Sequence, residues 1–336
     1  MQLQTTMASP AQARQYFEIT SVESLSTLLD KHHFDGQSIV VLGQGSNTIF
    51  TDDFNGVVLA NRILGRLIVY EDQDSIHIRF GAGESWHDLV VWTLQNNWYG
   101  LEQLALIPGL IGAAPIQNIG AYGVELKDVF VSLECIDIKT VNTQSCSLSD
   151  CQFAYRDSIF KQRWRDKKVI TSVTLCLHKK MPKYSLNNLY PALREIIKTE
   201  QNDESKITAQ DVFQVVCDVR SSKLPDPGVI PNSGSFFKNP LISAQQQAAL
   251  LERFPDLVNY PVSDGYKLAA AWLIERAGFK GFFDEKGIGC YAKQALVLIN
   301  PQRRKGSEVL NFARQVQQGV EQLFDVTLEI EPRIYP

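Results

Sequence analysis

The sequence predicts an α+β protein in three parts: residues 1–66 with a terminal strand at 326–336 returning near the functional site, residues 67–223, and an α/β part at 224–325. Three observations predict this organisation. The chain has 336 residues, more than one ordinary core contains. Runs with strand periodicity dominate its middle. The Pro-, Gly- and Ser-rich stretch LPDPGVIPNSGS separates that middle from a helix-rich remainder.

The first two parts alternate helical and extended patterns. A capping box from Thr20 to Glu23 predicts a helix start, and the runs SIVVLG and GVVLAN predict strands after it. The middle part reads as strands at LIVYED and SIHIRFGAG, a helix beginning near Ser85, and strands at FVSLECIDIKT and KKVITSVTLCL. A helix capped by Thr208 and Asp211 then leads into the boundary, so the middle part is expected to be mainly antiparallel.

The third part is expected to contain three helices and a strand. The helices are SAQQQAALLERF, KLAAAWLIERAG and SEVLNFARQVQQGVEQLF, with the strand ALVLIN between the last two. The terminal TLEIEPRIYP alternates with period two, which places Leu328 and Ile330 on one face. The opposite face carries Glu329, Glu331 and Arg333, and it either lines a site or faces solvent. Pro332 requires an edge position or a bulge in that strand.

Composition limits the partners. The 33 Lys and Arg nearly balance the 37 Asp and Glu, and no basic stretch is dense enough for nucleic-acid binding. The opening residues lack a signal-peptide pattern and no apolar run reaches membrane-spanning length, so we expect a cytoplasmic protein without membrane contact. The six cysteines lack metal or dithiol spacing, and we expect no metal site. We also expect a monomer, although no sequence feature sets the oligomeric state.

A glycine loop follows the first apolar strand. It comprises Gly43, Gln44, Gly45, Ser46 and Asn47. A dinucleotide fingerprint would need glycine at Thr48 and a helix after the loop, but the following residues favour a strand, which argues against a Rossmann fold. The loop still offers exposed backbone N–H groups that suit a pyrophosphate, and the alternative is a simple turn.

A second loop, residues 107–123, carries four glycines, three alanines and two prolines and no charge. Such a backbone can approach a large planar ligand closely, or can simply make a tight bend. The adjacent amides Gln117 and Asn118 need partners among apolar neighbours, which favours a binding role.

The segment NSGSFFKNP at 232–240 combines serines, a lysine and asparagines around two phenylalanines, as expected of a polar site with an apolar wall. It lacks a nucleophile elbow and a nearby histidine, so a serine hydrolase is disfavoured, and no phosphate-loop motif occurs. Arg156, Arg220 and Lys223 could bind carboxylate or phosphate, although each could equally form a surface ion pair.

Seven segments together resemble the UDP-N-acetylenolpyruvoylglucosamine reductase family in order and spacing, from about residue 36 to 334. They are VLGQGSN, IPGLIGAAPIQNIGAYGVEL, FAYRDSIF, KLPDP, NSGSFFKNP, KLAAAWLIE and LEIEPRI. GQGSN alone is shared with many flavoproteins of the vanillyl-alcohol-oxidase type. The resemblance implies that fold for the first two parts, noncovalent FAD, NADPH as hydride donor, and UDP-N-acetylglucosamine-enolpyruvate as the substrate bound by the third part.

The resemblance also implies residue roles. Arg156 and Glu331 would stabilise charge that develops beside the substrate carboxylate, and Ser235 would protonate the carbon next to the one that receives hydride. Glu331 must then donate a hydrogen bond, so a raised pKa is expected. The implied FAD contacts are Gly43, Gln44, Gly45, Ser46, Asn47, Pro108, Gly109, Gly112, Ala113, Ala114, Gln117, Asn118, Gly120, Ala121, Tyr122, Gly123 and Arg220. The implied substrate contacts are Tyr184, Lys223, Lys238, Asn239, Tyr260 and Gln294.

Three alternatives stay open at this point. The family's first type carries a tyrosine on a mobile loop, and the register allows Tyr184, which we favour, Tyr190 or neither. A flavin oxidase or dehydrogenase would not use Ser235 and Glu331 as a functional pair. A catalytically silent nucleotide-binding or scaffold protein would tolerate alanine at both positions.

Overall fold

The computed structural model describes residues 1–32, 34, 36–200, 203 and 206–336. The chain forms two compact units. The larger unit comprises residues 15–44 and 55–220, and the smaller unit comprises residues 1–14, 45–54 and 221–336. The chain therefore passes between the units at residues 14–15, 44–45, 54–55 and 220–221. The division into three parts stays a prediction.

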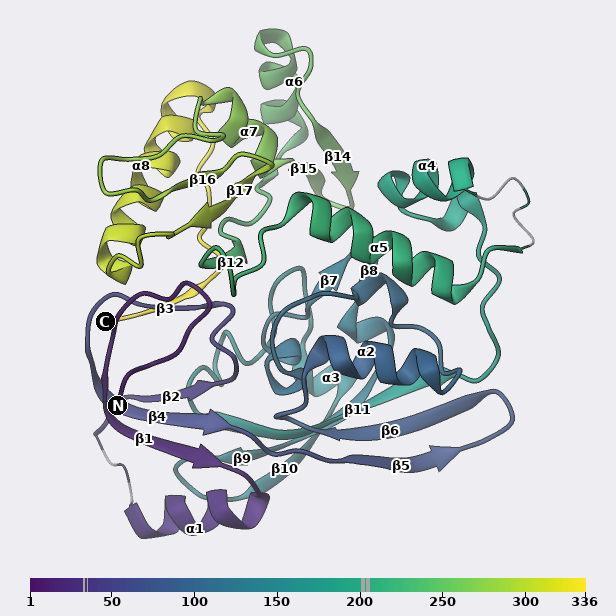
Figure 1. Ribbon diagram of the computed structural model, residues 1–336, viewed down its shortest axis with the longest axis vertical. Coiled ribbons are helices and arrows are strands. Elements are labelled where there is room, and N and C mark those ends of the chain that lie inside the picture. Colours follow the sequence, from purple (N-terminus) through teal and green to yellow (C-terminus); the bar gives the residue numbers. More distant parts are fainter. Residues whose placement is uncertain (33, 35, 201–202, 204–205) are drawn as a thin grey trace. The chain divides into compact units, whose positions relative to one another are not determined.

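Two sheets form the frame of the larger unit (Figure 1). The three-stranded sheet has the order β1 (Ala13–Ile19), β4 (Phe54–Asn61), β2 (Ile39–Leu42), with β2 parallel to β4. The five-stranded sheet has the order β10 (Thr143–Ser147), β9 (Phe130–Asp137), β11 (Lys168–His178), β6 (Ser75–Gly81), β5 (Arg66–Glu71). All neighbours in it are antiparallel, which confirms the expected character of the middle part.

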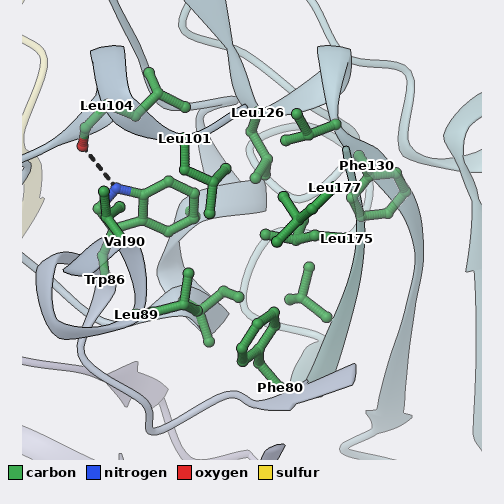
Figure 2. Close-up of a cluster of buried hydrophobic side chains, with 14 of the residues drawn as sticks. Phe80, Trp86, Leu89, Val90, Leu101, Leu104, Leu126, Phe130, Leu175 and Leu177 are labelled. Carbon is green, nitrogen blue, oxygen red and sulfur yellow. Dashed lines mark hydrogen bonds between the residues drawn. The ribbon is translucent and has the colours of Figure 1, made fainter. Parts of the chain in front are cut away.

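Helices cover these sheets because their apolar stripes need burial. Helices α2 (Trp86–Gln95) and α5 (Ala209–Lys223) share one core with β6 and β11. Helix α1 (Val22–His32) packs in a second core with β4. Figure 2 shows the first core, in which the indole N–H of Trp86 donates to the Leu104 carbonyl oxygen at 2.8 Å. The remaining short elements of this unit are β7 (Gly120–Ala121), β8 (Val124–Glu125), α3 (Leu148–Cys151) and α4 (Pro191–Glu200).

The smaller unit has its own core. One sheet has the order β12 (Asn232–Ser235), β17 (Gln294–Ile299), β16 (Gly289–Tyr291). A second has the order β13 (Leu241–Ile242), β15 (Gly265–Leu268), β14 (Asn259–Val262). Strands β3 (Thr48–Phe50) and β18 (Arg333–Tyr335) form a parallel pair. Its helices are α6 (Ala244–Arg253), α7 (Ala270–Arg276) and α8 (Gly306–Phe324). Fully buried Leu273, Leu298 and Phe312 join α7, β17 and α8 in one apolar cluster. None of the described helices has the length and apolar composition needed to cross a membrane.

Three details differ from the predictions. The capping box at Thr20 and Glu23 is wrong by one residue, because Ser21 and Ser24 exchange the reciprocal side-chain bonds that open α1. The predicted helix KLAAAWLIERAG begins only at Ala270, since the residues before it pair in β15. The terminal segment keeps the expected alternation at Leu328 and Glu329, but its paired strand begins after Pro332.

We predict that Trp86→Phe lowers the free energy of unfolding of the larger unit by about 2–3 kcal/mol, because it leaves a small cavity and an unpaired buried carbonyl at Leu104. Trp98→Phe, at a partly exposed position, should cost under about 1 kcal/mol. Urea unfolding followed by circular dichroism measures both changes. Equal losses for the two variants would contradict the importance of the buried indole.

Candidate active site

The loop at residues 107–123 lies against the connection between β6 and α2 in the larger unit. The Gly112 N–H donates to the Ala82 carbonyl at 2.9 Å, and a Cβ on Gly112 would lie only 2.6 Å from the Ala82 Cβ. The Gly109 N–H donates to the side-chain oxygen of Gln44 at 3.1 Å, and the Gly109 carbonyl accepts from the Trp86 N–H. The two backbone segments therefore pack closely, as a tight bend requires, and any larger residue at 112 would push them apart.

The first glycine loop contributes to both units. In the larger unit, the Gly43 carbonyl accepts from the Arg62 guanidinium at 3.1 Å. In the smaller unit, Gly45 has a φ of +68°, and a Cβ there would lie 2.8 Å from the Thr5 Cα. The Asn47 carbonyl accepts from the Arg333 N–H where β3 pairs with β18. The loop thus leads into a strand and not into a helix, as the sequence predicted.

Arg156 occupies a strained turn in the larger unit. Ala154 and Asp157 exchange backbone hydrogen bonds at 3.1 and 3.2 Å, which leaves Arg156 in the turn with a φ of +53°. A guanidinium nitrogen of Arg156 donates to the Gly120 carbonyl at 2.8 Å. A left-handed arginine costs about 1–2 kcal/mol, so the contacts around the turn must hold it.

Arg220 lies close to Tyr122 and near enough to Arg156 for their charges to interact. Arg220 donates to the Leu106 carbonyl at 3.2 Å, while its Nε is buried without a hydrogen-bond partner. Burial lowers the pKa of Arg220, although a guanidinium stays protonated at ordinary pH. Burial raises the pKa of Tyr122, and the Arg220 charge limits that rise. A buried cation with an unpaired N–H beside a glycine-rich backbone fits an anionic group such as a cofactor phosphate.

The structure separates the two candidate tyrosines. The hydroxyl of Tyr184 is buried without a hydrogen-bond partner, and burial together with the nearby Glu102 carboxylate raises its pKa. Tyr190 is 39% exposed, and its ring lies 5.7 Å from the ring of Tyr122 at an angle of 78°. Tyr190 therefore contacts Tyr122, another predicted site residue, through its ring.

Ser235 and Glu331 lie on neighbouring segments of the smaller unit. The Glu331 N–H donates to the carbonyl of Phe236, the residue after Ser235, at 2.9 Å. Two residues away, the Lys238 N–H donates to the Glu329 carbonyl at 2.9 Å. Ser235 is exposed, whereas Phe236 is fully buried. The predicted serine and glutamate are therefore brought together by backbone pairing, with the expected apolar wall beneath.

The predicted substrate residues differ in how they are used within the smaller unit. The Asn239 side-chain oxygen accepts from the Ala270 N–H at 2.9 Å and so caps α7. Lys238 forms an ion pair with Glu329. Tyr260, 44% exposed, lies on β14, and Lys223 is exposed at the end of α5. The side-chain oxygen of Gln294 accepts from the Leu296 N–H at 3.3 Å.

Sequence reasoning missed two side chains that hold the Arg156 turn. The Ser158 hydroxyl donates to the Ile116 carbonyl at 2.7 Å, and the Glu125 carboxylate accepts from the Asn118 amide at 2.9 Å. Ser158 lies within the FAYRDSIF segment and Glu125 within IPGLIGAAPIQNIGAYGVEL, but only their pairing in space reveals a role.

The residues that the structure describes contain no group of three or more His, Cys, Asp or Glu side chains placed to hold a metal ion.

Comparisons with known proteins match most of the chain. Residues 226–335 match the family model "UDP-N-acetylenolpyruvoylglucosamine reductase, C-terminal domain", and residues 13–146 match "FAD binding domain". The chain is 46% identical over 320 residues to a UDP-N-acetylenolpyruvoylglucosamine reductase of Shewanella oneidensis, covering 94% of this chain and 90% of the relative. It is 47% identical over 298 residues to a Burkholderia lata protein of that name, covering 87% and 83%.

A solved structure shares the fold. The reductase of the same name from Thermus caldophilus aligns with a TM-score of 0.67 at 20% identity, covering 100% of this chain and 98% of that one. The predicted fold class is confirmed: an α+β FAD-binding fold of the vanillyl-alcohol-oxidase type joined to a carboxyl-terminal domain. On the identity and coverage of these relatives, the chain belongs to the UDP-N-acetylenolpyruvoylglucosamine reductase family.

Proposed function

We propose that this protein uses FAD and NADPH to reduce the enolpyruvyl ether of UDP-N-acetylglucosamine-enolpyruvate, which gives UDP-N-acetylmuramate for peptidoglycan synthesis. Membership of the reductase family, shown over nearly the full chain, carries the proposal. The pairing of the segments that hold Ser235 and Glu331 supports it, because a flavin oxidase has no need of that pair. We place the enzyme in the cytoplasm as a monomer.

The residues of the larger unit fit a bound FAD. Arg220 offers a buried N–H without a hydrogen-bond partner for a phosphate, and Gly43, Gln44 and the 107–123 loop would lie against the cofactor. Gly45, Ser46 and Asn47 would continue this contact. When bound, FAD supplies hydride transfer from NADPH to the substrate double bond.

The protein's own part in the reaction is electrostatic and acid–base. Addition of hydride to the terminal carbon of the enolpyruvyl group leaves negative charge on the carbon beside the carboxylate. The Arg156 guanidinium stabilises that charge, and protonated Glu331 adds a hydrogen-bond donor. The Ser235 hydroxyl then gives its proton to the charged carbon, which completes addition across the double bond.

The substrate's UDP-sugar would be held in the smaller unit. Lys223, Lys238 and Tyr260 suit the diphosphate, and Asn239 and Gln294 suit polar groups of the substrate. For the tyrosine that closes over the substrate we now favour Tyr190, because its exposed ring contacts Tyr122 while the Tyr184 hydroxyl is buried.

We predict that the purified protein is yellow and that it oxidises NADPH only when the enolpyruvyl UDP-sugar is present. Absorbance at flavin and NADPH wavelengths measures both properties. A colourless protein that FAD cannot reconstitute would refute the proposal. Rapid NADPH oxidation with oxygen alone would indicate a flavin oxidase instead.

Ser235→Ala should leave reduction of the flavin by NADPH within about threefold of wild type and slow product formation at least about 100-fold, because only the proton donor is lost. Stopped-flow measurement of the two half-reactions separates these effects. Ser233→Ala, on the same strand, is the matched control and should change neither half-reaction by more than about threefold. Equal loss in both half-reactions of Ser235→Ala would mean that the serine has another role.

Tyr190→Ala should raise the KM for the UDP-sugar about 10-fold or more, because a side chain that closes over the substrate is lost. Tyr184→Phe should leave KM within about twofold and change mainly stability, since its hydroxyl is buried beside Glu102. Steady-state kinetics at saturating NADPH tests both. The reverse pattern would assign the closing role to Tyr184.

A further inference from the structure

We infer that Asn118 is a positioning residue for Arg156: its side-chain amide fixes the turn that presents the arginine to the substrate. The inference rests on the proposed function, since it concerns the arginine of the same reaction. It goes beyond the cofactor contact that the sequence assigned to Asn118, because it gives the side chain a separate task within the protein.

Both donor hydrogens of the Asn118 amide are bonded to protein groups. Asn118 is 0% exposed. Its Nδ2 donates to the Glu125 carboxylate at 2.9 Å and to the Ala154 carbonyl at 3.2 Å, and its Oδ1 accepts from the Lys127 N–H at 3.0 Å. These bonds use both donor hydrogens of the amide and one acceptor position of its oxygen. The side chain therefore joins its own loop to residue 154, the first residue of the Arg156 turn.

Further bonds join the same two segments. The Arg156 side chain donates to the Gly120 carbonyl at 2.8 Å, and the Ser158 hydroxyl donates to the Ile116 carbonyl at 2.7 Å. The contacts of residues 154, 156 and 158 thus fall on residues 118, 120 and 116 of the other segment. Residues 154, 156 and 158 are therefore each hydrogen-bonded to the 107–123 loop, so the loop binds the chain before, at and after Arg156.

Backbone strain explains why such ties are needed. Asn118 has a φ of +45° and Arg156 a φ of +53°, and neither is a glycine. Residues in this region persist only where their surroundings over-determine them. Asparagine tolerates the left-handed region better than most residues, and its short amide can reach the neighbouring backbone there. Arginine has no such advantage, so the Arg156 conformation depends on the bonds around it.

Asn118→Gly provides a sharp test, because glycine accepts the positive φ and removes only the amide. Asn97 is the matched control: it is also an asparagine in the larger unit, with a φ of +58°, but it is exposed. Both holoenzyme variants would be compared with Arg156→Ala and with the Asn118→Gly, Arg156→Ala double variant. The readouts are FAD affinity, flavin reduction by NADPH, and flavin reoxidation by the enolpyruvyl UDP-sugar.

We expect Asn118→Gly to slow reoxidation by the substrate about 10- to 100-fold, the cost of a small misplacement of a catalytic group. FAD affinity and flavin reduction should stay within about threefold, and Asn97→Gly should match wild type in all three. The double variant should be no more than about threefold slower than Arg156→Ala alone, because an absent arginine cannot be misplaced.

Three outcomes would overturn the inference. The double variant could reoxidise its flavin more slowly than Arg156→Ala by the full factor that Asn118→Gly shows alone. Asn118→Gly could reoxidise at the normal rate, or it could lose FAD affinity and both half-reactions equally. If Asn118→Gly does not fold, Asn118→Asp decides by the same criteria, since it keeps the size of the side chain and removes the N–H groups that bond to Glu125 and Ala154, and Ser158→Ala cuts a second tie of the turn. If the wild-type enzyme, Asn118→Gly and Ser158→Ala all turn over the substrate at similar rates, the positioning inference is refuted and the proposed function stands. If the wild-type enzyme does not turn over the substrate, the proposed function is refuted.

Discussion

The hydrogen bonds between residues 116–120 and the turn at 154–158 are the constraint on which the larger unit's part of the site depends. They hold two left-handed residues, Asn118 and Arg156, of which the arginine costs about 1–2 kcal/mol. A typical internal hydrogen bond contributes about 1 kcal/mol, and one to a charged group about 1.5–3 kcal/mol. The bonds therefore offset the strain by a similar amount. The bonds hold the arginine in its turn without a ligand, which would lower the entropy lost in the proposed contact with the substrate carboxylate.

The smaller unit places its residues by a different means. Ser235 and Glu331 are set by backbone pairing, because the Glu331 N–H and the Phe236 carbonyl bond directly and the Lys238 N–H continues the ladder. Buried Phe236 and Phe237 anchor this pairing in the core formed with α7 and α8. An exposed serine over buried phenylalanines would suit the proposed proton donor, since its hydroxyl is neutral in the free enzyme and needs only a defined position. Side-chain hydrogen bonds thus position Arg156 within the larger unit, and backbone pairing positions Ser235 and Glu331 within the smaller unit.

Many of the helices and strands could be predicted from the sequence, because the patterns that predict them are local. The alternation in SIHIRF and the helical pattern beginning near Ser85 correctly predicted β6 and α2. The start of α1 was misassigned because Thr20 and Ser21 are both good caps and only the folded chain selects one. The use of Asn118 and Ser158 could not be predicted, because their partners at Glu125, Ala154 and Ile116 are set by tertiary pairing. Likewise, the sequence does not distinguish the roles of Tyr184 and Tyr190, whose side chains differ in burial in the structure.

The most direct test of the central claim is a crystal structure of the protein with FAD and the enolpyruvyl UDP-sugar bound. The account predicts that Arg156 keeps its left-handed turn and its bond to the Gly120 carbonyl while its guanidinium meets the substrate carboxylate at about 2.7–2.9 Å. A substrate carboxylate bound by another cation, with the Arg156 guanidinium more than about 6 Å away, would contradict it.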